Sequence, residues 1–274
     1  MPTIRANDLD IGYEVRGASA AQPLVILHGA ATTAGYTFGR QMPALTAAFR
    51  VVLPDARGHG RTLWDVGRGF RAEWLVDDLE AFADALGLDT FHLMGYSIGG
   101  MTALGFAVRR PERLRTLVVA GITTSREPRA SVVRRLMDPG RIERDEPDWA
   151  ADLERLDTTQ GAGAWRALVT AVAADVASQP LLTPVEIRAI TAPTLVMCGD
   201  RDPLVPVAQA ADLARSVRDG RLFVAPGAGH DLANERPEAC ASVMLEFYRS
   251  TDAVARARAG VTDAVAHAAR EDAP

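Results

Sequence analysis

Ser97 lies at the centre of the segment GYSIG (residues 95–99), which follows a strand-like run and precedes a helix-like run. A serine in this context is typical of a nucleophile, because a sharp strand-to-helix turn exposes its hydroxyl and requires small neighbours. The helix that begins there directs free N–H groups and the positive end of its dipole toward the serine. The N–H of Ile98 can therefore stabilise an oxyanion. The alternative is a serine that only caps an internal helix.

An acid and a base follow Ser97 in the chain. Residues 195–206, LVMCGDRDPLVP, indicate an apolar strand followed by two aspartates. We expect Asp200 to cap the turn and Asp202 to orient the base, because the carboxyl ends of parallel strands share one rim of the sheet. His230 lies in a glycine-rich loop after the next strand-like run, where a neutral imidazole can accept the serine proton. The alternatives are a turn-forming aspartate and a surface histidine.

A second oxyanion donor is expected in VILHGAAT, residues 25–32, where a strand ends at a His-Gly pair. The backbone N–H of Ala30, directly after this pair, is our candidate. His28 offers an alternative catalytic base. We favour a structural role for it, in which the ring hydrogen-bonds a neighbouring loop.

The elements that must position these residues alternate between short apolar strands and amphipathic helices. The expected strands are Asp10–Val15, Leu24–Leu27, Val51–Leu53, Phe91–Met94, Leu117–Ala120, Thr194–Cys198 and Arg221–Val224. Several are apolar throughout, as expected for strands covered on both faces. The alternation predicts an α/β fold with a mostly parallel, doubly wound sheet, and an antiparallel ribbon at the N-terminus.

The alternation stops between Thr123 and Ala192, where helical patterns occur without a convincing strand. We therefore expect a core of residues 1–122 and 193–250, with a helical cap insertion of residues 123–192 over the active site. Residues 251–274 form a tail to which we assign no function.

Apolar and aromatic side chains of the cap are candidates for the substrate pocket. The cap candidates are Leu136, Met137, Trp149, Leu153, Trp165, Leu168 and Val172, and the core adds Tyr96, Leu204 and Leu232. The alternative for each of them is ordinary core packing, which is the more common role of such side chains. The set predicts a small to medium, partly hydrophobic substrate. Arg126 or Arg129 can bind a substrate carboxylate, but we favour surface positions for both.

Composition limits the classes of partner. The chain has 274 residues, 48% of them hydrophobic, and a formal net charge of −5. This balance favours a small-molecule substrate and disfavours nucleic acid and membranes, and a homodimer is left open. Two cysteines without zinc-site spacing indicate no disulfide framework and no metal site. Without a signal peptide pattern or a run of roughly 18 apolar residues, we expect a cytoplasmic protein.

The order Ser97, Asp202, His230 is that of the α/β-hydrolase superfamily, which the chain resembles from about Leu9 to Arg249. PDARGHGRT (residues 54–62) is similar to the superfamily's D-x-R-G-x-G-x-S segment, and ERPE (residues 235–238) to its E-x-P segment. The resemblance implies the catalytic triad and the two oxyanion donors named above. It also places Arg57 and His59 in a structural loop. The serine disfavours haloalkane dehalogenases and epoxide hydrolases, which use aspartate.

The expected function is hydrolysis of a carboxylic ester or lactone through an acyl-enzyme, without a cofactor. A C–C bond hydrolase, an acyltransferase and a perhydrolase remain alternatives on the same fold. A ligand receptor, or a lyase or cyclase that uses the same pocket, are alternatives of another class.

Overall fold

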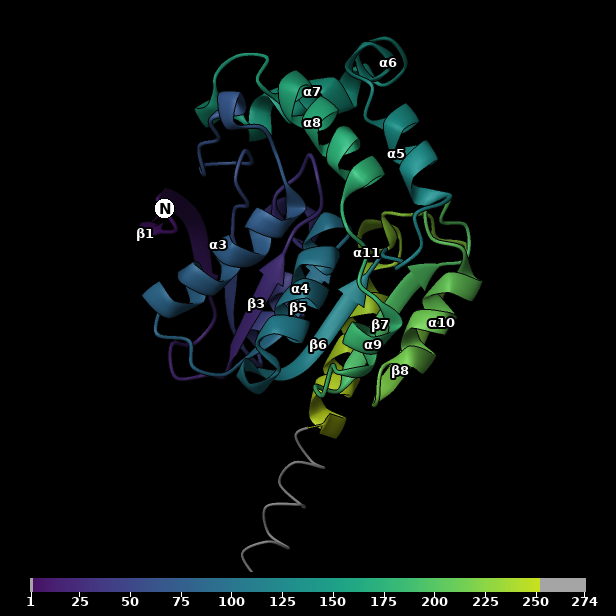
Figure 1. The fold of residues 1–274 in the computed structure, drawn as a ribbon. Coiled ribbons are helices and arrows are strands. Elements are labelled where there is room, and N and C mark those ends of the chain that lie inside the picture. The colour runs from purple at the N-terminus through teal and green to yellow at the C-terminus, as the bar shows by residue number, and fades with distance from the viewer. Residues whose placement is uncertain (1, 252–274) are drawn as a thin grey trace, which may run out of the picture.

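The computed structural model describes residues 2–251, which fold around an eight-stranded sheet (Figure 1). The strand order is β1-β2-β4-β3-β5-β6-β7-β8. The strands are β1 (Thr3–Ala6), β2 (Leu9–Arg16), β3 (Pro23–Leu27), β4 (Arg50–Pro54), β5 (Phe91–Tyr96), β6 (Leu114–Ala120), β7 (Thr194–Gly199) and β8 (Gly220–Ala225). β1 pairs antiparallel with β2, and β2 pairs antiparallel with β4. All neighbours from β4 to β8 are parallel, which confirms the mostly parallel sheet.

Helices cover both faces of the sheet because successive side chains of each strand point to opposite faces. In β3, Val25 and Leu27 belong to one buried cluster, and Leu24 and Ile26 belong to another. The first cluster includes side chains of α3 (Ala72–Ala85), α4 (Ile98–Arg109) and α10 (Val207–Ser216). The second includes side chains of α1 (Ala34–Thr37), α2 (Met42–Thr46) and the helix that begins at Pro237. This arrangement is the doubly wound architecture expected from the sequence.

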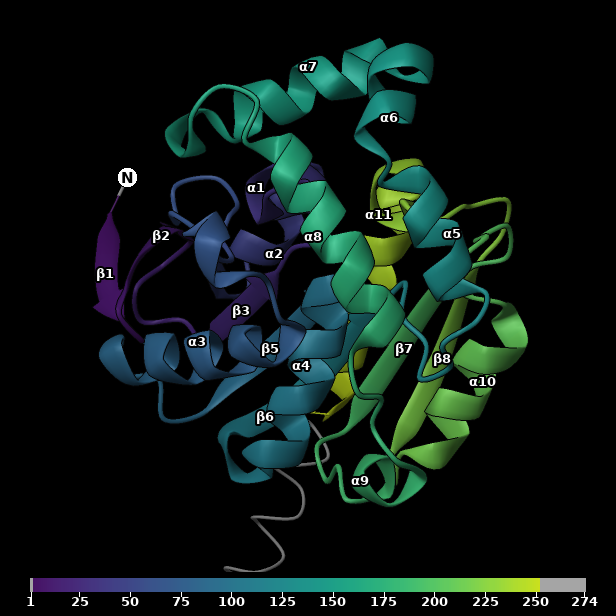
Figure 2. The same cartoon turned by 45° about the horizontal axis from the view of Figure 1, so that its top comes forward.

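The chain between β6 and β7 is helical. Its helices are α5 (Arg129–Leu136), α6 (Pro139–Asp145), α7 (Pro147–Leu156), α8 (Trp165–Ser178) and α9 (Pro184–Arg188). Figure 2 shows α5 to α8 above the carboxyl ends of the strands. α9 instead packs against α4 and α10, and its Ile187 is buried in the core of the sheet. The end of the expected cap range 123–192 therefore packs on the core.

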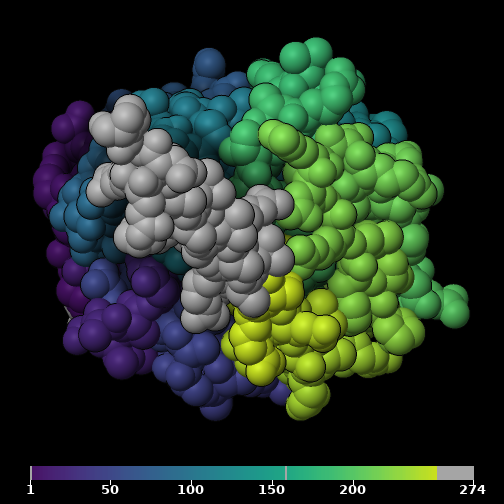
Figure 3. All heavy atoms as spheres, turned by 90° about the horizontal axis from the view of Figure 1, so that it is seen from below, coloured from purple at the N-terminus to yellow at the C-terminus, as the bar shows by residue number. Residues whose placement is uncertain are grey.

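The described chain ends at Thr251, on the side of the molecule away from the cap (Figures 1 and 3). The tail expected for residues 251–274 lies, except for Thr251, outside the described residues. Within residues 2–251, the structure contains no helix long and apolar enough to cross a bilayer.

Candidate active site

Ser97 occupies a strained turn between β5 and α4. Its backbone has φ of 53° and ψ of −119°, a region that residues other than glycine seldom adopt. Two glycines make the turn sterically feasible. A Cβ on Gly95 would lie 2.2 Å from the carbonyl oxygen of Gly99, and a Cβ on Gly99 would lie 2.4 Å from that of His28. The spacing of small residues seen in the sequence is thus required by backbone contact.

The structure brings Ser97, His230 and Asp202 together from three separate loops at the carboxyl ends of the strands. The Ser97 Oγ lies 3.1 Å from Nε2 of His230, and Nδ1 of His230 lies 2.8 Å from Oδ2 of Asp202. These distances are within hydrogen-bonding range. The side chain of Asp202 is fully buried, whereas that of His230 is 22% exposed. A neutral imidazole in this position can accept the serine proton while its other nitrogen donates to the carboxylate.

Backbone groups fix the carboxylate of Asp202. Its Oδ1 accepts hydrogen bonds from the N–H groups of Leu204 at 2.8 Å and Val205 at 3.2 Å, so that Oδ2 is left for His230. Asp200 has a different partner, because its Oδ1 accepts a hydrogen bond from the N–H of Gly227 at 2.7 Å. Asp200 therefore stabilises the turn between β7 and the loop after β8.

The two expected oxyanion donors both line the cavity that contains Ser97. Ile98 begins α4, where the first N–H groups of a helix have no acceptor within the helix. Ala30 follows β3, and the next residue, Ala31, has a positive φ of 58° and donates its N–H to Nε2 of His59 at 3.1 Å. Neither Ala30 nor Ile98 donates its N–H to another group within residues 2–251. The two N–H groups can therefore receive an oxyanion.

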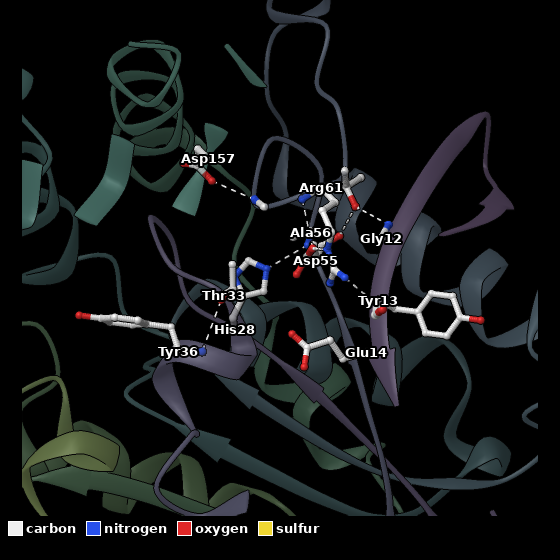
Figure 4. Close-up of polar contacts among 12 residues, drawn as sticks. Gly12, Tyr13, Glu14, His28, Thr33, Tyr36, Asp55, Ala56, Arg61 and Asp157 are labelled. Atoms are coloured by element: carbon white, nitrogen blue, oxygen red, sulfur yellow. Dashed lines mark hydrogen bonds and ion pairs between the residues drawn. The ribbon is translucent and has the colours of Figure 1, made fainter. Parts of the chain in front are cut away.

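His28 and His59 hold the loops around Ala30 in place, and Figure 4 shows His28 beside Ala56. The His28 Nε2 accepts the N–H of Ala56 at 2.9 Å, so Nδ1 carries the proton and donates to the Gly29 carbonyl at 2.7 Å. Burial lowers the pKa of both histidines to about 4, which keeps both rings neutral near pH 7. His28 makes the loop contacts expected of a structural residue.

The loop of residues 54–62 is tied to the rest of the core by side-chain hydrogen bonds. Arg57 donates to both carboxylate oxygens of Asp78 on α3, at 2.7 and 2.6 Å. Thr62, which replaces the usual serine of this segment, donates to the carbonyl of Asp55 at 2.7 Å and accepts from the N–H of Gly12 at 3.0 Å. A threonine hydroxyl supplies the same pair of bonds, so the substitution leaves the loop intact.

A cavity of about 460 Å³ opens above Ser97, between the carboxyl ends of the strands and the cap. Tyr96, Trp149 and Leu204 line it, as do Leu136, Met137 and Val172 of the cap. The cavity lining further includes Met101, Ile122, Val133 and Val176, which the sequence analysis missed. Val133 follows Arg129 by one turn of α5, so the two residues lie on the same face of that helix. This spacing is the sequence signal that could have placed both in the lining.

Four expected pocket residues lie outside the cavity lining. Trp165 is 2% exposed, packs against Leu153 within the cap, and donates from Nε1 to Glu154 at 3.0 Å. Leu168 and Leu232 are buried in the two clusters that flank the sheet. The prediction that these side chains contact substrate is therefore not supported, because each is enclosed by neighbouring side chains. The preference for a surface Arg129 was wrong, since this arginine is 6% exposed and lines the cavity.

Side chains from the cap also hydrogen-bond the core. Asp157, after α7, accepts the N–H of Gly60 at 2.9 Å (Figure 4), and Gln160 accepts the N–H of Trp64 at 3.1 Å. Asp175 of α8 accepts the N–H of Ala72 at the start of α3, at 3.1 Å. The cap is thus held over the cavity at several points.

The pH dependence of the Asp157 contact gives a first testable prediction. Burial raises the pKa of Asp157 from 3.8 to about 6, so the folded chain binds this proton more tightly than the unfolded chain. Stability should therefore fall as the pH rises through the interval between these two values, and the loss is complete above it. Asp157→Asn stays neutral and keeps an acceptor for Gly60. We expect it to raise Tm at pH 7.5 by roughly 4–8 °C, for a gain on the order of 2 kcal/mol.

Thermal unfolding of the parent and the variant from pH 4 to pH 8 tests this prediction. The gain should shrink toward pH 4, where the parent carboxyl is protonated in the folded chain and about half protonated in the unfolded chain. Asp148→Asn, at an exposed aspartate of α7, is the matched control and should show no such gain. A stability difference between Asp157→Asn and the parent that stays constant with pH would contradict the assignment.

Comparison with known proteins agrees with the fold. A model described as the alpha/beta hydrolase family matches residues 24–243. A protein provisionally named as the carbamate hydrolase RutD of Caulobacter sp. (strain K31) is 28% identical, with 86% of this chain and 94% of that protein covered. The 2-hydroxymuconate semialdehyde hydrolase of Pseudomonas sp. (strain CF600) is also 28% identical, with 91% and 98% covered.

Among solved structures, a thermophilic esterase from Thermogutta terrifontis superposes with a TM-score of 0.73 at 25% identity. The superposition covers 91% of this chain and 98% of the esterase. Because the family model matches most of the chain, including strands β4 to β8 and all but the first residue of β3, the protein belongs to the alpha/beta hydrolase family.

Proposed function

We propose that the protein is a serine hydrolase that cleaves a carboxylic ester or lactone through an acyl-enzyme. The observation that carries this proposal is the hydrogen-bonded series from Ser97 through His230 to Asp202, at a strained turn beside a 460 Å³ cavity. A nucleophile, a base within reach of it, and a buried acid that orients the base are the parts needed for acyl transfer.

The reaction has two halves. Nε2 of His230 accepts the Ser97 proton while Oγ bonds to the carbonyl carbon, and the electron pair of the C=O bond moves to oxygen. The N–H groups of Ala30 and Ile98 stabilise this oxyanion, at about 3 kcal/mol for each donor. The imidazolium then gives its proton to the departing alkoxide as the C–O bond breaks. Water repeats these steps on the acyl-enzyme and restores the Ser97 hydroxyl.

The cavity supports a substrate of small to medium size with an apolar part. Its volume of about 460 Å³ falls within the range of small-molecule sites, and apolar side chains of β5, α4, α5 and α8 contribute much of its lining. Each CH₂ group buried there contributes about 0.8 kcal/mol, or about fourfold in kcat/KM. We therefore expect p-nitrophenyl butyrate to react roughly 15-fold faster than the acetate in kcat/KM, as measured by initial rates.

C–C bond hydrolysis is the second candidate. It is supported by the 28% identity to 2-hydroxymuconate semialdehyde hydrolase, whose name denotes a substrate that is neither an ester nor a lactone. Carbamate hydrolysis is suggested in the same way by the relative from Caulobacter. The same nucleophile and base would serve these reactions, so the bond that is cleaved must be determined by experiment.

The test compares p-nitrophenyl esters, a γ-lactone, an aryl carbamate and a vinylogous 1,5-diketone with the same enzyme. Rapid quench and intact mass measurement should detect an acyl adduct during ester turnover, located by peptide mapping at residue 97. Turnover of the diketone alone would replace the proposal with C–C hydrolysis. Saturable ligand binding without turnover would favour a receptor, and turnover without an adduct would favour a lyase.

A further inference from the structure

Arg129 is a buried cation in the wall of the active-site cavity. It is the first residue of α5, is 6% exposed, and lines the same cavity as Ser97. Its Nε and Nη2 atoms are buried without a hydrogen-bond partner, and it forms no ion pair with any of residues 2–251. A buried charge without a partner is destabilising, so such groups normally have a counterion.

The surroundings of Arg129 add positive charge, and no acid of residues 2–251 forms an ion pair with it. Burial lowers the pKa of the Arg129 guanidinium, and the neighbouring Arg126 lowers it further. An arginine nevertheless stays protonated in proteins. Asp175 is the acid that acts on it in the opposite sense, but the two side chains form no ion pair: Oδ1 of Asp175 accepts the N–H of Ala72, and its buried Oδ2 has no hydrogen-bond partner. Within residues 2–251, the guanidinium of Arg129 is therefore left without an ion pair and with two unpartnered nitrogens.

The nearby Arg126, in contrast to Arg129, has hydrogen-bond acceptors for its guanidinium. Its Nη1 donates to the carbonyl of Ala177 at 2.6 Å, and its Nη2 donates to that of Gln179 at 2.8 Å. These bonds cap the carboxyl end of α8 and hold it beside the start of α5 (Figure 2). Arg126 is thus explained by the fold, whereas Arg129 is not.

A second unpartnered donor lines the same cavity. Gln179 is 6% exposed, and its Nε2 is buried without a hydrogen-bond partner. Because the Gln179 carbonyl is bonded to Arg126, this residue belongs to the same junction of α5 and α8 as Arg129. A cation and an amide N–H donor that both lack acceptors match an anionic, oxygen-rich ligand group.

The other charged groups of the lining disfavour an anion elsewhere in the cavity. The acidic residues among them are Glu146, Asp152 and Asp231. Glu146 pairs with Arg141 at 2.5 Å, and Asp152 pairs with Arg155 at 2.6 Å. Neither of these two arginines lines the cavity. Like charges would repel a substrate anion from these acids, so the lining directs it toward Arg129.

We propose that Arg129, assisted by Gln179, binds a carboxylate of the substrate, which is therefore an ester or lactone that also carries a free carboxylate. The identity of the cleaved bond in this inference rests on the proposed function. The assignment of the carboxylate site to Arg129 and Gln179 is independent of it. The carboxylate would supply the ion-pair partner that Arg129 lacks within residues 2–251, and its position would set which carbonyl reaches Ser97.

The test compares a half-ester of a dicarboxylic acid, monoethyl glutarate, with ethyl valerate, a neutral ester that has the same five-carbon acyl chain without the carboxylate. We expect the parent to prefer the half-ester, and Arg129→Met to lower the ratio of kcat/KM for the two by 10- to 150-fold. Arg129→Lys keeps the charge and should restore part of the preference. Arg134→Met, at an exposed arginine of the same helix, is the matched control and should keep the parent ratio.

Binding and stability measurements separate this proposal from the proposed function. Calorimetric titration of Ser97→Ala with monoethyl glutarate and ethyl valerate measures recognition without chemistry, and Arg129→Met on this background should remove the difference. Arg129→Met should also raise Tm, because it removes an uncompensated buried charge. Equal affinities for the two esters would overturn the carboxylate site even where esters are hydrolysed. A preference that depends on Arg129 without any ester turnover would retain the site and overturn the proposed function.

Discussion

Replacing Ser97 with alanine should lower kcat/KM for p-nitrophenyl butyrate by about 10⁵- to 10⁶-fold. The Ser97 Oγ is the group that lies 3.1 Å from the base, Nε2 of His230, and alanine leaves nothing there to attack a carbonyl. Binding and the oxyanion donors would supply the small residual rate. Initial rates measure the loss, and labelling of the intact protein with a fluorophosphonate, mapped by peptide mass spectrometry, locates the nucleophile.

The backbone at residue 97 provides an independent check on this result. Alanine keeps the Cβ and therefore the strain of a positive φ, so Ser97→Ala should melt close to the parent temperature. Ser97→Gly should be equally inactive but should melt at a higher temperature, since glycine adopts this conformation without a steric cost. Ser242→Ala, at an exposed serine, should label and turn over like the parent. Labelling of the Ser97→Ala protein, or a rate within 100-fold of the parent, would refute the assignment.

The sheet and the grouping of Ser97, Asp202 and His230 could be predicted because local chemistry determines them. Apolar runs such as Val25 to Leu27 have few alternatives to a strand covered on both faces. Each of the three site residues follows such a strand, and parallel strands bring their carboxyl ends to one rim. The small residues around Ser97 are likewise a local requirement, imposed by contacts with the carbonyl oxygens of Gly99 and His28.

The cavity lining was harder to predict because it depends on how the cap helices rotate against the core. Trp165 and Trp149 are both aromatic residues of the cap, yet Trp165 packs inside the cap and Trp149 lines the cavity. Arg129 shows the same limitation for charge. An arginine at the start of a helix is usually solvated, and its burial here follows from the packing of α5 against α8. Residue type alone predicts neither which cap aromatic lines the cavity nor which arginine is buried.

Asp202→Asn should lower kcat by about 10⁴-fold while the fold stays intact. In the parent, Oδ1 accepts the N–H groups of Leu204 and Val205, and Oδ2 faces Nδ1 of His230. Two backbone donors require an acceptor, so the amide oxygen of asparagine must take the place of Oδ1. Its NH₂ group then faces the ring and donates to Nδ1. The imidazole proton therefore moves to Nε2, which faces Ser97 and can no longer accept the serine proton.

Initial rates and the tautomer of His230, observed by nitrogen NMR on histidine-labelled protein, test this sequence of steps together. Asp200→Asn is the matched control, because Asp200 is an exposed aspartate two residues earlier that accepts the N–H of Gly227 at 2.7 Å. Asparagine keeps an acceptor for that bond, so the rate should stay within a few-fold of the parent. If both variants lose activity equally, the loss comes from a general disturbance of the loop after β7, and the specific role of Asp202 in orienting His230 is refuted. If only Asp202→Asn loses activity and its proton lies on Nε2, the carboxylate acts by fixing the tautomer of the base.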